Sequence, residues 1–592
     1  MKKPTRLFDL MQFQADNKPL PDAIAAKVNG RWQTYSSQEV LTKAEEVAAG
    51  LYRLGIRRGD KVAIISMNRP EWNFLDLGIQ MLGAASVPIY PTAPTDDYKF
   101  ILNHAEVKMA FCGTKAIYDR IKIAAQDAKL LKEIYTFDQI PDTHFWQDIL
   151  KPQGDSKNSE INRLREQVKS EDLASIIYTS GTTGTPKGVL LSHNNILSNV
   201  LGVHEVIPSH SLKRALSFLP LCHVFERTVN YFYQYSGIAI YYAESIETIS
   251  ENLKEVKPQV FVSVPRLLEK IYVKITSKGA ELTGLKRKLF DWSMDIGLKY
   301  EPDQPSSIMT NLQIELARKL VFSKWQEALG GNVQLIVSGG SALQPRLARI
   351  FGAAGLRIIE GYGLTESSPV ITCNRPNDFR IGTVGIPLPG VQVKIADEEG
   401  YPSGEGEILA KGPNIMQCYF KNPEATKEVI DPDGWLHTGD IGKMIDGRFL
   451  KITDRKKEMF KTSGGKYVAP LALESKFKES PYIDNLMVTG ENQKFPSAII
   501  LPDFQALKEW ARQNGIGQLD NSALVNNDKV NQLISDEIQR LNKTFGQWEQ
   551  VKKFKIIADE WTSERGELTP KLSLKRRVLT AKYKEIIEGL YK

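Results

Sequence analysis

The stretch NVQLIVSGGSALQPRLARIFGAAGLRIIEGYGLTE, Asn332 to Glu366, decides the fold class. It begins with an apolar run at Val333–Val337, and Pro345 then stands where a helix would begin. Gly355 predicts the end of that helix, and Leu356–Ile359 has the composition of a second strand. Together they predict a βαβ unit with two parallel strands.

The same alternation of strand and helix occurs nearer the N-terminus. VAIISM (Val62–Met67) is a short β-branched run, and Pro70 then opens a stretch with apolar residues at helical spacing: Trp72, Leu75, Ile79 and Leu82. We therefore expect an α/β fold with doubly wound, mostly parallel sheets. In such sheets, ligands bind beyond the carboxyl ends of the strands. Three glycine-rich segments fall there: Thr179–Gly188, Gly339–Ser341 and Gly361–Thr365.

The first of these segments, YTSGTTGTPKGV (Tyr178–Val189), has the composition of a phosphate-binding loop without the common spacing. A Walker A loop reads G-x-x-x-x-G-K-S/T. Counted from Gly181, its second glycine would be Pro186, and the residue after Lys187 is Gly188 rather than a hydroxyl residue. Small residues let backbone N–H groups approach an anion, while hydroxyls and a lysine add donors and charge. The segment predicts a different kind of phosphate site, with a flexible linker as the plainer alternative.

Length and composition narrow the class of protein. A chain of 592 residues exceeds what one core supports, and 42% hydrophobic with 25% charged residues is ordinary for soluble globular proteins. A net charge of +7 suits anionic ligands or membrane surfaces and does not require nucleic acid. The four cysteines lack the spacing of a zinc site or a disulfide framework. Without a signal peptide or an apolar run of about 18 residues, we expect a cytoplasmic protein able to contact the inner face of a membrane.

The later part of the chain predicts a change of architecture. Between Arg380 and Phe420, short β runs are broken by Gly and Pro, as in a small barrel or sheet. The charged cluster Asp454–Lys457 then marks a boundary. We expect an N-terminal domain of residues 1–454, with a β-rich, barrel-like subdomain at about 375–454, and a smaller C-terminal domain of residues 455–592.

Six motifs occur in the order seen in the adenylate-forming, or AMP-binding, enzymes: YTSGTTGTPKG, FLPLCHVFER, GYGLTE, GWLHTGD, ITDRKKEMFKTSGGKYVAP and LTPKLSLKRR. The resemblance runs from about Thr34 to the C-terminus. The chain most resembles long-chain fatty-acyl-CoA synthetases, through Asp433–Lys457, the helical insertion after Val264–Tyr272 and the polar insertion Gln505–Gly546. It implies that a fatty acid and ATP give acyl-AMP and pyrophosphate, and that CoA then displaces AMP. It also implies a mobile α+β C-terminal domain with a hinge near residues 454–457.

The resemblance assigns the nucleotide site residue by residue. Tyr362 would stack on adenine, and Asp440 and Arg455 would bind the ribose hydroxyls. Thr365 would contact the α-phosphate, and Glu366 would bind Mg²⁺. Further residues of the adenine pocket would be Gly340, Ser341 and Gly363. The loop around the β- and γ-phosphates would consist of Thr179, Ser180, Gly181, Thr182, Thr183, Gly184 and Lys187.

Three more side chains receive roles from the resemblance. His223 would lie where the carboxylate and the α-phosphate meet, and Lys571 would stabilise the charge that builds up between them. Lys461 would be nearer the active site in the orientation that the C-terminal domain adopts for thioester formation. Plainer readings exist: His223 as a structural residue, Asp440 as a helix cap, and Lys571 as part of a solvated basic tail.

The sequence features that indicate the substrate class are less specific than these motifs. Six aromatic residues follow His223 and suit either an apolar acyl tunnel or an ordinary core: Tyr231, Phe232, Tyr233, Tyr235, Tyr241 and Tyr242. The resemblance favours a long-chain fatty acid. A fatty-acyl-AMP ligase that loads a carrier protein would share every adenylation motif and stays open as an alternative. A luciferase-like oxygenase and a non-catalytic lipid-binding protein are further alternatives.

Overall fold

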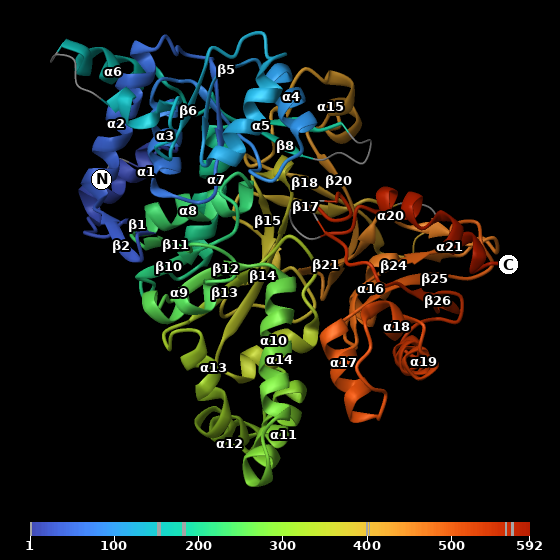
Figure 1. The fold of residues 1–592 in the computed structure, drawn as a ribbon. Helices are drawn as coiled ribbons and strands as arrows, with labels where there is room; N and C mark the ends of the chain where they lie inside the picture. The colour runs from blue at the N-terminus through green and yellow to red at the C-terminus, as the bar shows by residue number, and fades with distance from the viewer. Residues whose placement is uncertain are drawn as a thin grey trace.

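The computed structural model describes residues 3–150, 156–179, 185–397, 401, 403–562, 565–569 and 573–592. Its large N-terminal domain contains two sheets flanked by helices, and a smaller C-terminal domain lies beside it (Figure 1). The predicted α/β fold with two domains of unequal size is confirmed. None of the helices within these described ranges has the length and apolar character needed to cross a bilayer.

One sheet has eight strands in the order β19-β9-β8-β4-β3-β5-β6-β7. Strands β8 to β7 pair in parallel, whereas β9 is antiparallel to β8 and β19. The strands are β3 (Lys61–Ile65), β4 (Ala85–Pro88), β5 (Val107–Cys112), β6 (Glu133–Thr136), β7 (His144–Phe145), β8 (Leu173–Thr179), β9 (Lys187–Ser192) and β19 (Cys418–Tyr419). The helices of this region are α1 (Asp9–Asn17), α2 (Ser37–Arg53), α3 (Pro70–Met81), α4 (Thr95–His104), α5 (Lys115–Ala125), η1 (Trp146–Leu150), α6 (Ser156–Gln167) and α7 (His193–Val206). As predicted, Pro70 opens α3.

The second sheet has nine strands in the order β16-β15-β14-β13-β12-β10-β11-β1-β2. Its strands are β1 (Ile24–Val28), β2 (Arg31–Tyr35), β10 (Arg214–Ser217), β11 (Ala239–Tyr242), β12 (Val260–Ser263), β13 (Leu335–Ser338), β14 (Arg357–Gly363), β15 (Val370–Cys373) and β16 (Ile386–Pro387). Between them in sequence lie α8 (Val224–Ser236), α9 (Ile249–Val256), α10 (Pro265–Ala280), α11 (Gly284–Lys299), α12 (Ile308–Ala317), the π-helical turn η2 (Arg318–Phe322), α13 (Ser323–Ala328) and α14 (Pro345–Ala353).

The βαβ unit that decided the fold class is present. β13 and β14 pair in parallel with Leu335 opposite Arg357, and Pro345 is the first residue of α14 between them. Gly355 has φ +77°, a left-handed conformation that suits glycine after a helix. One detail was wrong: the GYG of GYGLTE belongs to β14 itself, which continues to Gly363 and forms a hairpin with β15.

Helix α8 joins the two large sheets through buried polar contacts. Arg227 donates to Asp76 of α3 at 2.6 Å, to Ser86 of β4 and to Ser175 of β8. On the other side, the Tyr242 hydroxyl of β11 donates to Asn230 at 2.7 Å. Both Arg227 and Asp76 are almost fully buried, so each charge depends on the other for compensation. The aromatic run after His223 lies in this region and forms core rather than the wall of the cavity described below.

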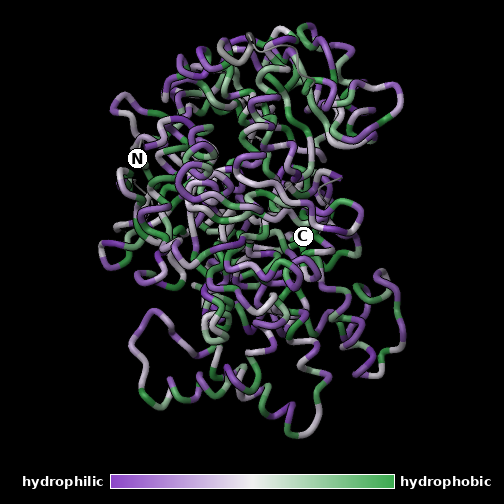
Figure 2. The backbone as a smooth tube through the Cα atoms, turned by 90° about the vertical axis from the view of Figure 1, so that its left-hand side faces the viewer, coloured by the Kyte–Doolittle hydropathy of each residue, from purple (hydrophilic) through white to green (hydrophobic). Residues whose placement is uncertain are grey.

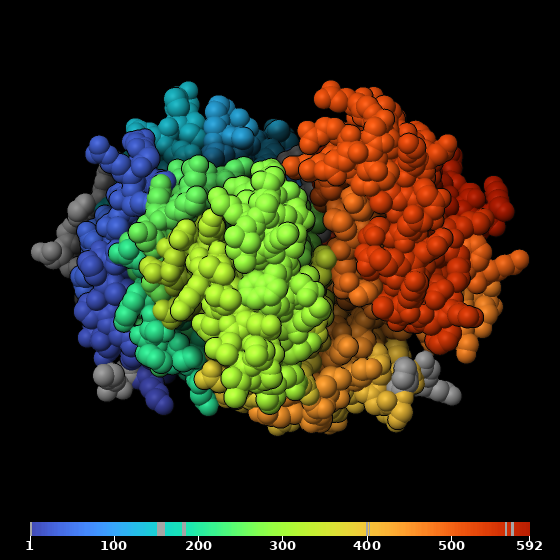
Figure 3. Space-filling view, turned by 90° about the horizontal axis from the view of Figure 1, so that it is seen from below, coloured from blue at the N-terminus to red at the C-terminus, as the bar shows by residue number. Residues whose placement is uncertain are grey.

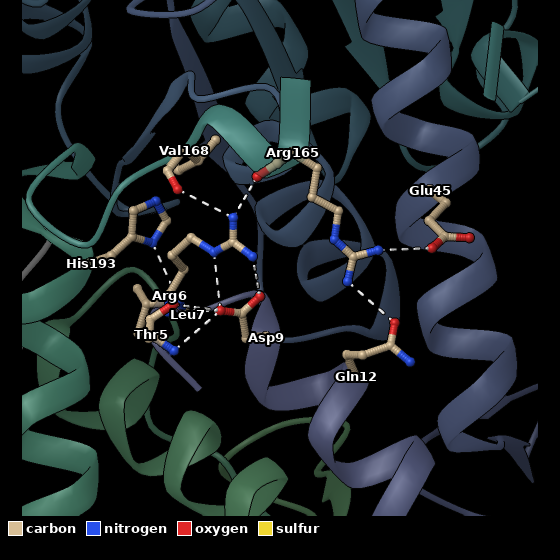
Figure 4. A network of polar contacts seen from close by, with 9 residues as sticks. All are labelled: Thr5, Arg6, Leu7, Asp9, Gln12, Glu45, Arg165, Val168 and His193. Atoms are coloured by element: carbon tan, nitrogen blue, oxygen red, sulfur yellow. Dashed lines mark hydrogen bonds and ion pairs between the residues drawn. The ribbon is translucent and has the colours of Figure 1, made fainter. Parts of the chain in front are cut away.

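The N-terminal segment is tied to this domain by the polar network in Figure 4. Arg6 donates to both carboxylate oxygens of Asp9 and to the carbonyl oxygens of Arg165 and Val168. The Leu7 N–H donates to Nδ1 of His193 at 3.3 Å. Burial lowers the pKa of His193 to about 3, so the ring is neutral and able to accept.

The β-rich region forms an open four-stranded sheet in the order β17-β18-β20-β21. Of the two predicted forms, a small sheet or a small barrel, the described strands form the sheet. Its strands, all antiparallel, are β17 (Gln392–Ile395), β18 (Glu405–Lys411), β20 (Leu436–Ile445) and β21 (Phe449–Arg455), and α15 (Pro423–Val429) precedes β20. Its buried face packs together with Tyr362 of β14 in one small hydrophobic cluster. This contact attaches the sheet to the end of β14.

The C-terminal domain has its own hydrophobic core, drawn from residues between Phe460 and Tyr583. A three-stranded sheet, β24-β25-β26, and a short hairpin, β22-β23, carry helices around them (Figure 1). The elements are β22 (Phe460–Lys461), β23 (Tyr467–Val468), α16 (Pro470–Phe477), β24 (Ile483–Thr489), β25 (Ser497–Pro502), α17 (Phe504–Gln513), α18 (Asn521–Val525), α19 (Asp528–Asn542), β26 (Lys553–Ile556), α20 (Arg576–Lys582) and α21 (Lys584–Gly589). The polar segment Gln505–Gly546 contains most of α17 and all of α18 and α19.

Candidate active site

A cavity of about 360 Å³ lies where the carboxyl ends of β8, β13 and β14 meet. This is the position that ligands occupy in open α/β sheets, and the volume is within the range of small-molecule sites. Its walls come from both domains. The chain up to the end of β21 contributes Tyr90, Ile177, Tyr178, Thr179, His223, Gly340, Ser341, Ala342, Leu343, Glu360, Gly361, Tyr362, Gly363, Leu364, Thr365, Glu366, Gly382, Thr383, Val384, Asp440, Ile452 and Arg455, and the rest of the C-terminal domain contributes Leu471, Thr569 and Ser573.

Asp440 and Arg455 form a charged pair at one end of the cavity. They are directly opposite each other on β20 and β21, and Nε of Arg455 lies 3.3 Å from Oδ1 of Asp440. The Tyr362 hydroxyl donates to Oδ2 of the same aspartate at 2.8 Å. Burial raises the pKa of Asp440, and the nearby Arg455 and Tyr362 oppose that rise. Asp440 is a strand residue, so the helix-cap reading is wrong.

Tyr362 is almost fully buried within the cluster that joins β14 to the four-stranded sheet. Its ring lines the cavity, and its hydroxyl is already bound to Asp440. The backbone beside it permits little change, because a Cβ atom at Gly363 would lie 1.7 Å from the carbonyl oxygen of Pro369. Glycine at position 363 is therefore a steric requirement of the β14–β15 hairpin.

Thr365 and Glu366 form the short helical turn η3 (Thr365–Ser367) immediately after β14. Oε1 of Glu366 accepts a hydrogen bond from the Tyr419 hydroxyl at 2.7 Å, which fixes the direction of the carboxylate. The Nζ atom of Lys187 lies 5.0 Å from the centre of the Tyr419 ring. Tyr419 therefore links the end of the glycine-rich loop to Glu366, a role that sequence reasoning missed.

The glycine-rich loop is described only at its two ends. Thr179 and Lys187 are partners across the antiparallel pair of β8 and β9, and Thr179 lines the cavity. The remaining predicted loop residues lie outside the described residues: Ser180, Gly181, Thr182, Thr183 and Gly184. The β8–β9 pair holds the start and the end of the loop next to each other at the cavity.

His223 stands at the N-terminus of α8 and lines the cavity. Its Nδ1 accepts a hydrogen bond from the Phe225 N–H at 3.1 Å, so the imidazole itself caps the helix. The N-terminus of α8, where the helix dipole is positive, lies beside this ring. His223 therefore has a structural role as a helix cap. It also lines the cavity, which is the position expected of a residue that contacts the substrates.

Gly340 and Ser341 lie in the turn that follows β13, and Gly340 has φ +83°. Glu360 lines the cavity wall beneath them and accepts a hydrogen bond from the Leu343 N–H at 3.3 Å. Burial raises the pKa of Glu360 to about 8. Sequence reasoning missed Glu360 because its position in an apolar strand, RIIEG, gave no sign that it would lie at the cavity.

The C-terminal domain presents the flanks of one predicted lysine to the cavity. Thr569 and Ser573 line the cavity, whereas Lys571 between them lies outside the described residues. Lys461 is exposed on β22, with Nζ 4.6 Å from the centre of the Tyr467 ring, and it does not line the cavity. In this arrangement of the two domains, Thr569 and Ser573 therefore face the cavity, whereas Lys461 does not.

Contacts between the domains hold this orientation. The Arg346 guanidinium of α14 donates to the carbonyl oxygen of Glu479 at 2.8 Å. Arg266 of α10 forms an ion pair with Asp484 of β24. Both arginines project from the N-terminal domain to the segment around α16 and β24, so the C-terminal domain is fixed at the side of the cavity.

The chain belongs to the AMP-binding enzymes. Residues 12–420 match the AMP-binding enzyme family, and residues 458–592 match the AMP-binding enzyme C-terminal domain.

Among curated proteins, the chain is similar to the long-chain-fatty-acid–CoA ligase FadD15 of Mycobacterium bovis, with 33% identity over 95% of this chain and 93% of that protein. It is 34% identical to the peroxisomal long chain acyl-CoA synthetase 6 of Arabidopsis thaliana, over 95% of this chain and 82% of that protein. Among solved structures, the anthranilate CoA ligase AuaEII in complex with anthranoyl-AMP has a TM-score of 0.73 and 20% identity, with 98% of each chain covered. That likeness shows the shared fold.

Proposed function

We propose that this chain is a long-chain-fatty-acid–CoA ligase of the AMP-forming type. Membership of the AMP-binding enzymes and the names of its relatives support the activity. The observation that supports it most directly is the cavity in which Thr365 and Glu366 lie together with the Asp440–Arg455 pair, with Thr569 and Ser573 of the C-terminal domain also in its wall. The substrates are a long-chain fatty acid, ATP and CoA.

In the first half-reaction, a carboxylate oxygen of the fatty acid attacks the α-phosphorus of ATP. An oxygen–phosphorus bond forms, the bond to the β-phosphate oxygen breaks, and pyrophosphate leaves. Asp440 and Arg455 hold the ribose hydroxyls, and the Thr365 hydroxyl donates to the α-phosphate. Lys571 and the positive end of α8 beside His223 offset the negative charge that builds up at the reacting oxygens.

The residues around the phosphates fit a magnesium–ATP complex. Glu366 lies at the cavity wall with one oxygen fixed by Tyr419. A single carboxylate together with phosphate oxygens is a usual way of binding Mg²⁺. When bound there, Mg²⁺ neutralises phosphate charge and polarises the α-phosphate for attack. The loop from Thr179 to Gly184, with Lys187, would donate to the β- and γ-phosphates.

In the second half-reaction, the CoA thiolate attacks the acyl carbon and AMP leaves, which gives the thioester. Lys461 lies away from the cavity in the present orientation, so a contact from it would require the C-terminal domain to rotate. We propose that the domains divide as residues 1–454 and 455–592, and that the chain turns at residues 454–457. Asp454 and Arg455 are the last two residues of β21, so a rotation within this segment but after Arg455 would leave the Asp440–Arg455 pairing of β20 with β21 in place.

An acyl-chain panel tests this function. Purified protein, ATP and Mg²⁺ are incubated with fatty acids of increasing length, with and without CoA, and pyrophosphate, AMP and thioester are measured. We expect AMP and thioester to form together and to depend on CoA, with long chains preferred. Pyrophosphate release without any CoA-dependent thioester would instead favour a carrier-protein-loading ligase, and no pyrophosphate with any acid would contradict adenylation.

A further inference from the structure

Helices α10 to α13 project from the sheets and form one end of the molecule. Figure 1 shows α11 and α12 at its lower tip, and Figure 3, seen from below, shows this helical region facing the viewer. Figure 2 shows hydrophobic and hydrophilic stretches alternating in the same lower part of the chain. None of the proposed catalytic groups belongs to these helices, so their surface calls for a separate explanation.

An apolar stripe runs along α12 and η2 on the outside of this projection. Its members recur four residues apart, a spacing that places them along one ridge of a helix: Ile308, Leu312, Leu316 and Leu320. Ile308 is 82% exposed and Leu312 is 61% exposed, and Met309 beside them is also exposed. Single exposed leucines are ordinary, but a continuous row on a projecting helix marks a surface that contacts something apolar.

The stripe leads into a groove. Leu320 is both the last member of the stripe and part of a groove of about 780 Å³ between α9, α10, α11 and α13. Phe290 and Trp325 are buried at its apolar base. Gly279 lets α10 and α11 approach closely, because a Cβ atom there would lie 2.1 Å from the Phe290 ring. The apolar surface is therefore built into the packing of the projection.

Basic side chains surround the groove. Six lysines and one carboxylate, Glu247, lie along it; the lysines, all exposed, are Lys254, Lys270, Lys274, Lys278, Lys286 and Lys324. Across the described part of the chain, none of the six forms an ion pair, whereas Arg287 of α11 pairs with Asp291. An apolar groove with a rim of unneutralised ammonium groups is complementary to a ligand with apolar chains and an anionic surface.

We propose that this end of the molecule, the stripe of α12 and η2 together with the lysine-rimmed groove, is a docking surface for a bilayer containing anionic phospholipids. The apolar stripe would enter the boundary between headgroups and acyl chains, with α12 lying along the bilayer surface. The lysine stems would lie on apolar surface while their ammonium groups reach the lipid phosphates. The inference rests on this surface and does not require the proposed catalytic activity.

Vesicle binding by the full-length protein tests the proposal. Sedimentation is measured with vesicles of phosphatidylcholine alone and of phosphatidylcholine mixed equally with phosphatidylglycerol. We expect binding to the anionic vesicles that weakens as salt is raised. The triple change Lys270→Glu, Lys274→Glu and Lys278→Glu should lower the partition coefficient at least about tenfold, because each basic residue near an anionic surface contributes to binding.

Matched variants at the opposite end of the molecule control for net charge and apolar exposure. The change Lys122→Glu, Lys129→Glu and Lys132→Glu alters the net charge equally, on α5 and the segment after it, in the upper part of Figure 1. It should leave vesicle binding unchanged. Likewise, Leu312→Ser with Leu316→Ser should weaken binding, whereas Ile123→Ser with Leu130→Ser, which are also exposed, should not.

Three results would overturn the proposal. The first is that the wild-type protein does not bind anionic vesicles. The second is that the α5 variants lose as much binding as the α10 and α12 variants. The third is that the wild-type protein is a dimer which Leu312→Ser with Leu316→Ser makes monomeric while vesicle binding persists, since the stripe would then be an interface between two copies. Circular dichroism and the urea midpoint of each variant are compared with the wild type, and these exposed positions should leave both unchanged.

Discussion

Replacing Asp440 by asparagine tests the proposed ribose site with little change in shape. The side chain of Asp440 is 8% exposed, accepts a hydrogen bond from Tyr362 at 2.8 Å and pairs with Arg455 at 3.3 Å. Asparagine can still accept from Tyr362 through its amide oxygen. Arg455 is 53% exposed, so water can solvate its charge once the carboxylate is gone, and we expect a small effect on folding.

The effect on nucleotide binding should be large by comparison. A hydrogen bond from a ribose hydroxyl to a carboxylate contributes about 1.5–3 kcal/mol, which corresponds to a factor of about 10 to 150 in the dissociation constant. Calorimetry with AMP and with 2′-deoxy-AMP separates this contact from the rest of the site. The wild-type protein should prefer AMP, and Asp440→Asn should bind AMP at least about tenfold more weakly and lose most of that preference.

Asp454→Asn provides the matched control. Asp454 is buried on the neighbouring strand β21, where it accepts from the backbone N–H of Arg455, and it does not line the cavity. It should leave the preference for AMP over 2′-deoxy-AMP unchanged. If Asp440→Asn kept the wild-type preference, or if both variants lost it equally, the assignment of Asp440 to the ribose would be refuted.

Three further predictions follow the same logic. Glu366→Ala removes the carboxylate proposed to hold Mg²⁺, so pyrophosphate release should fall by about 10²-fold or more, and near-normal release would contradict that role. Lys571→Ala should slow adenylation by about 10²–10³-fold yet still convert synthetic acyl-AMP and CoA to thioester, and Lys461→Ala should show the reverse; equal loss of both half-reactions in Lys571→Ala would contradict a single site used in two orientations. Burial raises the pKa of Glu226 from 4.5 to about 8, so the folded state holds this proton more tightly and loses stability as pH rises between those values. Glu226→Gln should remove up to about 1.4 kcal/mol of that loss per pH unit, measured as urea midpoints at several pH values, and an unchanged pH dependence would show that Glu226 is ionised in the folded protein.

Local sequence features predicted much of the fold because local physics determines them. Pro70 and Pro345 open helices, and the positive φ of Gly355 ends one, so the strands on either side could be located from the sequence. The sequence placed the GYG segment beyond the carboxyl end of the strand Leu356–Ile359. In the structure, Gly363 is the last residue of β14, and glycine is required there because any side chain would collide with the backbone of Pro369.

Residues of the candidate site were predicted from the sequence only where they belong to a recognisable motif. Tyr419 and Glu360 lie in segments with no motif, and their relation to the cavity depends on contacts between distant parts of the chain. The aromatic residues after His223 left tunnel and core equally open, since both environments favour the same side chains. Tertiary contacts show that these residues form core. Helix α8 packs between two sheets, and the hydroxyls of Tyr231 and Tyr242 donate hydrogen bonds inside the core, to Asp76 and Asn230.

The most direct test of the proposed function follows one oxygen atom. When a carboxylate attacks the α-phosphorus, the bridging oxygen of acyl-AMP comes from the fatty acid, and it stays with AMP when the CoA thiol attacks the acyl carbon. A long-chain fatty acid labelled with ¹⁸O in its carboxyl group, incubated with the protein, ATP, Mg²⁺ and CoA, should therefore give AMP that carries one ¹⁸O atom per molecule of thioester, as measured by mass spectrometry. Unlabelled AMP, or ADP and labelled phosphate in its place, would contradict an acyl-adenylate intermediate.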